Sequence, residues 1–333
     1  MSKDKKDILI TGSAGFIASH LVDTFIDQGY KVIAVDNFCN FYSPEIKRAN
    51  ARKHYQASNC EVYEIDLLDY ESLEGIFRNH NISHIVHLAA MAGVRPSLEN
   101  PRLYDQVNNH STINLLDLAR KYQVEKFVFA SSSSVYGSRS NVPFREDEDI
   151  SKPISPYAAT KVAGEAMVHA MTHACSDMRA VCLRFFTVYG PRQRPDLAIH
   201  KFSKLIYEGK PIPVYGDGSF QRDFTYIDDI LDGLIKAVDY DKSKFEIFNL
   251  GESQTYSVRQ LISLLEDKLN KKAQVHYQDK VLGDVPITYA DISKARDVLG
   301  YNPSTKLEDG LDKFISWFLE QNNSNAILSK EAN

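Results

Sequence analysis

Two residues one helical turn apart, Tyr157 and Lys161 in the string YAATK, could act together as a base. Side chains at positions i and i+4 lie on the same face of a helix. An ammonium beside a phenol favours the phenolate, so we expect Lys161 to lower the pKa of Tyr157 from its usual value of about 10. Such a tyrosine can act as a general base near neutral pH. The spacing alone is common, and a solvated helix face is the ordinary explanation for it.

A run of four serines at residues 131–134 precedes this pair and follows the apolar stretch FVFA. If that stretch is a strand of a parallel sheet, the serines lie at its carboxyl end, where doubly wound sheets bind ligands. Serine hydroxyls there can form hydrogen bonds with a reacting hydroxyl. A serine run alone is typical of a polar loop. Serines at a strand end followed by Tyr157 and Lys161 are much more specific and indicate a catalytic site.

The string TGSAGFIA at residues 11–18 predicts a site for a dinucleotide. Gly12 and Gly15 stand where a strand turns into a helix, so a pyrophosphate can approach the helix N-terminus. Ala18 occupies the third glycine position, which tolerates alanine. Asp36, 21 residues after Gly15, ends the second predicted strand. A carboxylate there binds the adenosine ribose and repels a 2′-phosphate, which favours NAD over NADP. The alternative, an ordinary glycine turn with a surface aspartate, explains fewer of these features.

Short apolar runs separated by helical patterns predict a parallel sheet covered on both faces. The expected strands span residues 7–11, 31–36, 61–66, 84–89, 127–131 and 180–186, and the expected helices include residues 16–28 and 258–270. Right-handed crossovers then give an α/β, doubly wound Rossmann sheet. Prolines and glycines become frequent beyond Gly190, which predicts a smaller C-terminal α/β lobe for the substrate.

The expected domains are therefore an NAD-binding Rossmann domain at residues 1–190, a nucleotide-sugar-binding lobe at 191–322 and a frayed tail at 323–333. This division leaves open whether later segments return to the first domain. The chain has 333 residues, 43% hydrophobic and 25% charged, with a net charge of −5, which disfavours a nucleic-acid partner. No stretch reaches the roughly 20 apolar residues of a membrane span. The four cysteines lack metal-ligand spacing, and we expect a cytoplasmic location.

The strings TGSAGFIA, HLAA, SSSSVYG, YAATK, RFFTVYGPRQRPD and RDFTYIDD resemble the extended short-chain dehydrogenase/reductase family. The resemblance covers about residues 7–318 and is strongest to the nucleotide-sugar 4-epimerases, especially their UDP-glucuronate branch. It implies a homodimer that pairs the helix bearing Tyr157 with a helix at about residues 101–122.

The resemblance also implies roles for individual residues. The catalytic residues would be Ser132, Tyr157 and Lys161, with Lys161 also holding the nicotinamide ribose. The cofactor site would comprise Gly12, Gly15, Phe16, Ile17, Asp36, Asn37, Asp66, Leu67, Leu88, Ala89, Ala90, Asn108, Tyr157, Lys161, Phe185 and Val188. The substrate site would comprise Arg95, Ser132, Ser133, Ser134, Thr187, Arg194, Val214, Tyr215 and Arg222. No metal ligand is expected.

The implied reaction is reversible C4 epimerisation of a UDP-sugar through a 4-keto intermediate, with bound NAD as the transient hydride acceptor. The related 4,6-dehydratases read S-T-D-E-V-Y-G, whereas Ser133 and Ser134 replace that acid–base pair here. Uronate decarboxylases of the family carry a glutamate at the position of Ser134. We therefore expect epimerisation, and rank dehydratase, decarboxylase and reductase activities lower.

The expected substrate is UDP-glucuronate, with epimerases of neutral UDP-hexoses (UDP-glucose or UDP-GlcNAc) as the alternative. A uronate carboxylate needs paired donors, which arginine supplies best. Arg192 and Arg194 in GPRQRP and Arg95 in AGVRPS are the candidates, and Arg194 is favoured by the resemblance to the glucuronate branch. Pairing with a surface Asp or Glu, or binding of the diphosphate, remains the alternative for each.

Two further histidines, His169 and His173, stand at i and i+4 with Glu165 one turn earlier. Such a group could ligate a metal on one helix face. The string is not HExxH, so we expect a subunit contact or a solvated face instead.

Overall fold

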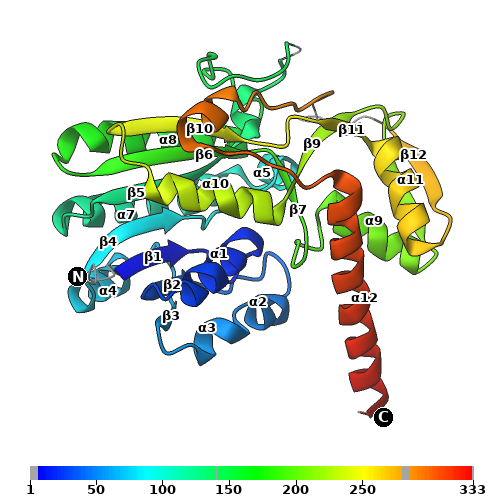
Figure 1. Ribbon diagram of the computed structural model, residues 1–333, viewed down its shortest axis with the longest axis horizontal. Helices are drawn as coiled ribbons and strands as arrows, with labels where there is room; N and C mark the ends of the chain where they lie inside the picture. Colours follow the sequence, from blue (N-terminus) through cyan, green and yellow to red (C-terminus); the bar gives the residue numbers. More distant parts are fainter. Residues whose placement is uncertain (1–6, 140, 280–284, 332–333) are drawn as a thin grey trace.

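A seven-stranded parallel sheet forms the centre of the larger part of the molecule (Figure 1). The computed structural model describes residues 7–139, 141–279 and 285–331. The strand order is β10-β6-β5-β4-β1-β2-β3. These strands are β1 (Asp7–Thr11), β2 (Val32–Asp36), β3 (Cys60–Glu64), β4 (Ile82–His87), β5 (Lys126–Ser132), β6 (Arg179–Phe185) and β10 (Phe245–Leu250). The order reverses between β1 and β4, which is where doubly wound sheets bind ligands. The predicted fold class is confirmed.

Both faces of this sheet are buried, which explains its nearly continuous apolar strands. In β1, Ile8 and Ile10 pack into one core and Leu9 into the other. These three side chains are at most 1% exposed. Successive side chains of a strand point to opposite faces, so a strand with alternating apolar and polar residues would have exposed one face to solvent.

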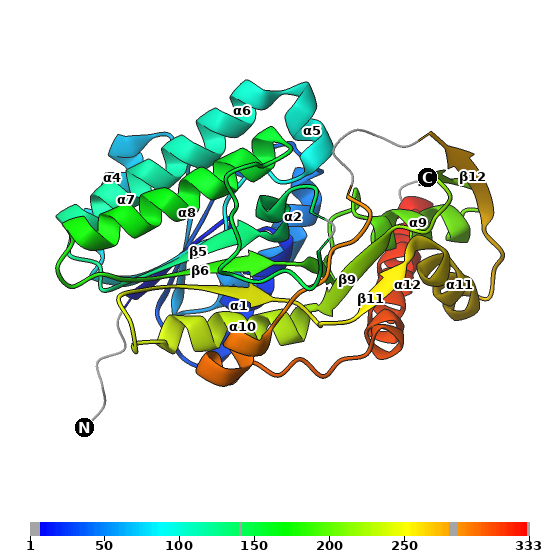
Figure 2. The ribbon, with the colours of Figure 1, turned by 90° about the horizontal axis from the view of Figure 1, so that it is seen from above.

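Helices cover the two faces in separate layers (Figure 2). One layer contains α7 and α8, and the other contains α1 and α10. The helices of the larger part are α1 (Phe16–Asp27), α2 (Pro44–Asn50), α3 (Arg52–Gln56), α4 (Tyr70–Asn79), α5 (Val94–Glu99), α6 (Pro101–Asp105), α7 (Ser111–Lys121), α8 (Pro156–Ala174) and α10 (Ile227–Asp239). A π-helical turn, η1 (Gln106–His110), joins α6 to α7, and a 3₁₀ turn, η2 (Ser133–Tyr136), follows β5.

A smaller lobe lies beside the carboxyl ends of the sheet (Figure 1). It contains a three-stranded sheet, β11-β9-β7, and a two-stranded sheet, β12-β8. Its elements are β7 (Thr187–Tyr189), α9 (Ala198–Tyr207), β8 (Pro211–Tyr215), β9 (Gln221–Tyr226), β11 (Thr255–Ser257), α11 (Val258–Leu269), β12 (Gln274–Gln278) and α12 (Leu307–Glu331). Another π-helical turn, η3 (Ala295–Leu299), precedes α12.

Later segments do return to the large sheet, because β10 pairs with β6 in parallel. The sequence pattern did not predict β10, which follows the Pro- and Gly-rich region attributed to the smaller lobe. The backbone is helical through residues 323–331, part of the segment predicted to fray. None of the described helices is both long and apolar enough to cross a membrane.

Candidate active site

A cavity of about 990 Å³ opens at the carboxyl edge of the sheet, beside the neighbouring strands β1 and β4, where the strand order reverses. This volume is at the upper end of the usual range for ligand sites. Most residues predicted for the cofactor line it: Gly12, Gly15, Phe16, Ile17, Asp36, Asn37, Asp66, Leu67, Leu88, Ala89, Ala90, Phe185 and Val188. So do the residues predicted for chemistry and substrate: Ser132, Ser133, Ser134, Tyr157, Lys161, Thr187, Arg194 and Arg222.

The glycine loop after β1 packs closely against the backbone after β4 and leaves the N-terminus of α1 open to a ligand. Gly12 has φ +68°, and a Cβ there would lie 2.8 Å from the backbone N and Cα of Ala89. Only glycine avoids both the strain and the collision. Gly15 is the N-cap of α1, and no side chain caps this helix end. The N–H groups of its first turn are therefore available to an anion such as a pyrophosphate.

Two aspartates lie at the same edge of the sheet: Asp36 ends β2 and Asp66 follows β3. Asp36 is 7% exposed and accepts hydrogen bonds from the backbone N–H groups of Ala14 (3.1 Å) and Phe38 (2.8 Å). Asp66 accepts from the Asn37 amide at 3.0 Å. Asp36 thus fixes the glycine loop while its carboxylate lines the cavity. The uncapped helix, the glycine cradle and this carboxylate together fit NAD.

Lys161 and Tyr157 lie on the cavity face of α8, as the spacing predicts. The Lys161 ammonium donates to the Ala130 carbonyl at 2.7 Å and lies 5.9 Å from the centroid of the Tyr157 ring. Lys161 is 4% exposed, and its burial lowers its pKa to about 8. The lysine is therefore a cation that readily loses its proton at mildly alkaline pH.

The prediction of a lowered pKa for Tyr157 is wrong. The pKa of Tyr157 is raised, because burial of the hydroxyl outweighs every stabilising contact. A hydrogen bond from Ser132 and the charge of Arg194 lower this pKa in part. The groups that favour the phenolate are thus a serine hydroxyl and an arginine rather than the lysine.

The serine run forms a short chain of hydroxyls that ends at Tyr157. Ser132 is the last residue of β5 and caps η2. Its Oγ accepts hydrogen bonds from the Ser134 backbone N–H (3.2 Å) and the Ser134 hydroxyl (3.0 Å). The Ser132 hydroxyl in turn binds the Tyr157 oxygen. Ser134 therefore orients Ser132, in addition to lining the cavity.

The two arginines of GPRQRP point to different places. Arg194 lines the cavity, forms a bidentate pair with Asp196 at 3.0 and 2.6 Å, and lies 5.0 Å from the Phe41 ring centroid. Arg192 instead pairs with Asp23 of α1 at 2.8 Å and has φ +62°. The left-handed backbone at Arg192 separates the two side chains. Of these two arginines, only Arg194 lines the cavity where a substrate would bind.

Four predicted residues do not line the described cavity. Asn108, 5% exposed on η1, lies behind it and binds the Met91 backbone N–H (2.8 Å) and carbonyl (3.0 Å). It shapes the wall rather than facing a ligand. Arg95 stacks on the ring of Tyr215, with 4.1 Å between the guanidinium carbon and the ring centroid, and the adjacent Val214 is 2% exposed. Direct substrate contacts of these last three residues stay predictions.

Comparisons with known proteins show which family the chain belongs to. A family model described as GDP-mannose 4,6 dehydratase matches residues 9–314. The chain belongs to this family, within the extended short-chain dehydrogenases/reductases. A UDP-glucuronate 4-epimerase of Thermodesulfobacterium geofontis is 42% identical over 314 residues, which are 94% of this chain and 96% of that protein.

Solved structures also resemble this dehydrogenase/reductase closely. The UDP-glucuronic acid 4-epimerase of Bacillus cereus, in complex with UDP-glucuronic acid and NAD, has a TM-score of 0.88 at 36% identity, covering 95% of this chain and 99% of that one. A UDP-glucose 4-epimerase of Thermotoga maritima, with UDP-glucose, has a TM-score of 0.87 at 33% identity and the same two coverages.

In this dehydrogenase/reductase, the loop between β2 and α2 and the helix α2 itself add cavity residues that the sequence reasoning missed. Phe41, Tyr42 and Lys47 line the cavity. The Tyr42 hydroxyl is buried without a hydrogen-bond partner, and the Lys47 ammonium lies 5.0 Å from the Tyr42 ring centroid. For Phe41 and Tyr42, the position shortly after Asp36, at a strand carboxyl end, was the signal that could have found them.

The histidines of α8 do not form a metal site with Glu165. The Nε2 atoms of His169 and His173 lie 3.4 Å apart on the surface, whereas Glu165 is buried against Arg184. Within the described part of the chain, no group of three or more His, Cys, Asp or Glu side chains is arranged to hold a metal ion.

Proposed function

We propose that this enzyme interconverts UDP-glucuronate and UDP-galacturonate by reversible C4 epimerisation, with NAD as a bound cofactor. The observation that carries the proposal is the hydroxyl chain from Ser134 through Ser132 to Tyr157, which shares one cavity with Arg194. The Thermodesulfobacterium and Bacillus relatives support it, since both are named for this reaction.

The chemistry assigned to the protein is proton transfer at the sugar 4-hydroxyl. Tyr157, as the phenolate, accepts the hydroxyl proton, and Ser132 donates a hydrogen bond to the reacting oxygen. The Lys161 ammonium would hold the nicotinamide ribose, as the family resemblance implies. NAD, when bound, supplies reversible hydride acceptance at C4. The keto sugar would turn its other face, C4 would take the same hydride back on that face, and Tyr157 would return the proton to the 4-oxygen to give the epimer without net redox change.

The residues beside Ser132 favour epimerisation over competing fates of a 4-keto sugar. Elimination of water needs an acid–base pair, and the two positions hold Ser133 and Ser134. Loss of CO₂ from a 4-keto uronate is fastest when the carboxylate is perpendicular to the ketone. Hydrogen bonds from Ser133, Ser134 and Arg194 would hold it away from that geometry.

A neutral UDP-hexose is the second candidate substrate, and the Arg194–Asp196 pair is the observation that favours it. In this pair the Nε and Nη2 edge of the Arg194 guanidinium already binds the Asp196 carboxylate. A uronate must therefore displace Asp196 or share Arg194 with it. The side chain of Asp196 is 47% exposed, so the released carboxylate would meet water.

Incubation of the purified protein with UDP-glucuronate, and separately with UDP-glucose, tests the proposal. Sugar nucleotides are separated, CO₂ is measured, and NAD is quantified after denaturation. We expect UDP-galacturonate, no CO₂ and co-purifying NAD. Release of CO₂ as fast as epimerisation would refute the anchoring role of the serines and Arg194. Turnover of UDP-glucose alone would assign the neutral substrate.

We further propose a homodimer formed through the layer of α7 and α8. Ile113 on α7 is 48% exposed, an unusual position for a large apolar side chain on an otherwise polar helix face. Light scattering should give twice the monomer mass of 37.7 kDa, and Ile113→Lys should lower it. A monomer in the wild type would refute this part. The cytoplasmic location stays a prediction.

A further inference from the structure

A buried ion pair behind the catalytic residues has no part in the chemistry described above. Glu165 on α8 and Arg184 on β6 are 4% and 2% exposed. The Arg184 guanidinium donates to both carboxylate oxygens of Glu165, from Nε at 2.9 Å and from Nη2 at 2.8 Å. Such a pair is a weak source of stability, because desolvation of two charges offsets most of their attraction. Stability alone therefore does not explain why this ion pair is buried here.

Glu165 lies on the same face of α8 as the catalytic groups. Tyr157, Lys161 and Glu165 stand at i, i+4 and i+8 on one face of α8. Each contacts one of three consecutive residues of β5. Tyr157 meets Ser132, the Lys161 ammonium binds the Ala130 carbonyl, and the Glu165 carboxylate accepts from the Ser131 hydroxyl at 2.5 Å.

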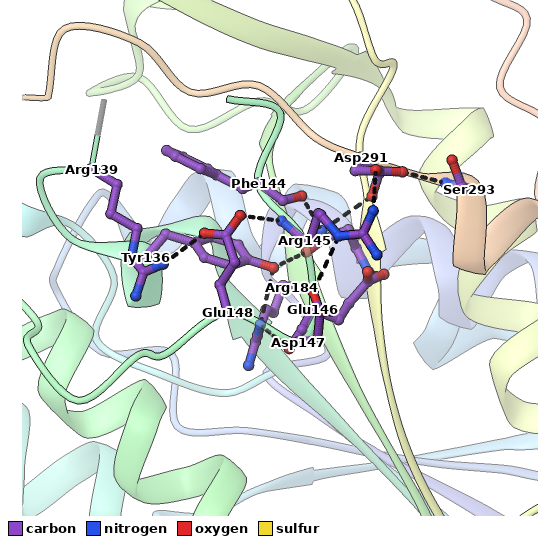
Figure 3. Close-up of polar contacts among 11 residues, drawn as sticks. Tyr136, Arg139, Phe144, Arg145, Glu146, Asp147, Glu148, Arg184, Asp291 and Ser293 are labelled. Atoms are coloured by element: carbon purple, nitrogen blue, oxygen red, sulfur yellow. Dashed lines mark hydrogen bonds and ion pairs between the residues drawn. The ribbon is translucent and has the colours of Figure 1, made fainter. Parts of the chain in front are cut away.

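Arg184 extends this attachment to the neighbouring strand and beyond. It is the register partner of Ser131 in the β5–β6 pairing. Its Nη1 donates to the Tyr136 hydroxyl at 3.0 Å, and Tyr136 donates to Asn249 at the end of β10 at 2.7 Å. Figure 3 shows this far side of Arg184, where Tyr136 and residues 144–148 gather. Glu165 thus joins α8 to β5, β6 and, through Arg184, β10.

We propose that Glu165 and Arg184 are positioning residues, which fix α8 against the end of β5 so that Tyr157 and Lys161 meet Ser132. The proposal rests on the epimerase function. Tyrosine, lysine and serine must hold their mutual distances to within a fraction of an ångström for proton transfer to be efficient. A neutral pair of similar volume would fill the same space without fixing the register of α8 on β5.

The charge of Glu165 also reaches Lys161. The titratable groups around Lys161 are Tyr157 and Glu165 on its own helix, His87 on β4 and Cys182 on β6. Burial lowers the pKa of His87 to about 3, so this ring is neutral. Glu165 raises the pKa of Lys161 against the larger lowering by burial. Without Glu165, Lys161 should lose its proton at lower pH.

The experiment compares Glu165→Gln, Arg184→Lys and the double variant Glu165→Gln/Arg184→Met with the wild type. The matched control is Thr172→Val, because Thr172 is 2% exposed on the same helix and its hydroxyl donates to the His169 carbonyl, away from the catalytic residues. Measurements are Tm, bound NAD, and kcat and KM for UDP-glucuronate against pH.

We expect Glu165→Gln to lower kcat by about tenfold to a hundredfold, with KM and bound NAD little changed. The limb of its kcat–pH profile near pH 8, which Lys161 sets, should move to lower pH, and Arg184→Lys should lose less kcat. The double variant should recover Tm but not kcat. A double variant with wild-type kcat and pH profile overturns the proposal, as does an equal loss in Thr172→Val.

A readout without turnover separates this inference from the proposed function. With 3-fluorotyrosine at position 157, ¹⁹F titration reports the pKa of this phenol. Relative to the wild type, the pKa should change in Glu165→Gln and stay the same in Thr172→Val. An inactive wild type would refute the proposed function alone. An unchanged fluorine titration in Glu165→Gln would refute the positioning role.

Discussion

Removal of the Arg194 guanidinium should separate uronate from neutral substrates. Arg194 is 14% exposed, lines the cavity and binds a carboxylate, that of Asp196, through two hydrogen bonds. A substrate carboxylate in the same fork would make two charge-assisted bonds, each worth about 1.5–3 kcal/mol. Displacing Asp196 costs about 0.2–1 kcal/mol, because an ion pair with a half-exposed partner is weak. The net contribution is on the order of 3 kcal/mol, or roughly a hundredfold in kcat/KM.

The assay is kcat/KM for UDP-glucuronate and UDP-glucose in the wild type, Arg194→Ala and Arg192→Asn. Arg194 also lowers the pKa of Tyr157, so both substrates should lose some rate in Arg194→Ala near neutral pH. The ratio of the two kcat/KM values cancels that common effect. We expect this ratio to fall about a hundredfold in Arg194→Ala.

Arg192→Asn is the matched control, because Arg192 lies two residues away and pairs with Asp23 outside the cavity. Asparagine tolerates the left-handed φ of +62° at this position. The control should leave the ratio unchanged. Equal losses for both substrates in Arg194→Ala, or intact uronate turnover, would refute the carboxylate role.

Three other changes test the remaining parts of the site. Tyr157→Phe should lower kcat by about 10²- to 10⁴-fold while NAD still co-purifies, as kinetics and NAD quantification will show; a smaller loss would point to another base. The kcat–pH profile should be bell-shaped, because the active form, Tyr157 phenolate with Lys161 ammonium, is most populated between the Lys161 pKa of about 8 and the higher, burial-raised pKa of Tyr157; kcat should rise to about pH 8 and fall at more alkaline pH, and a plateau to strongly alkaline pH would contradict this assignment. Gly12→Ala should lose NAD and lower Tm, because its Cβ would lie 2.8 Å from the Ala89 backbone. Gly209→Ala has the same φ of +68° and no atom within 4 Å, so it should keep NAD and cost only about 1–2 kcal/mol of backbone strain.

The parts of the site made by local strings were predictable from the sequence. The turn after β1 needs glycine at Gly12, the helix that follows has a period of 3.6 residues, and Tyr157 and Lys161 share a face because they stand at i and i+4. The six predicted strands agree with β1 to β6 within a few residues. In each case the physical cause acts over a few neighbouring residues, so one sequence window contains it.

Other features were decided by tertiary structure, because their causes join residues far apart in the chain. Burial, which raises the pKa of Tyr157, depends on everything packed around its hydroxyl and reverses the effect expected from Lys161 alone. The return of β10 to the sheet depends on its pairing with β6, and the sequence between them shows only a change in composition.

The pair formed by Tyr157 and Lys161 illustrates both kinds of cause. Helical spacing alone placed the two side chains together on α8. Their electrostatics and partners came from β5, β6 and the loop that bears Arg194, which are distant in sequence. The same holds for Arg192 and Arg194, which look equivalent in GPRQRP. Only the folded turn sends one to α1 and the other into the cavity, because an irregular backbone has no period from which side-chain direction can be predicted.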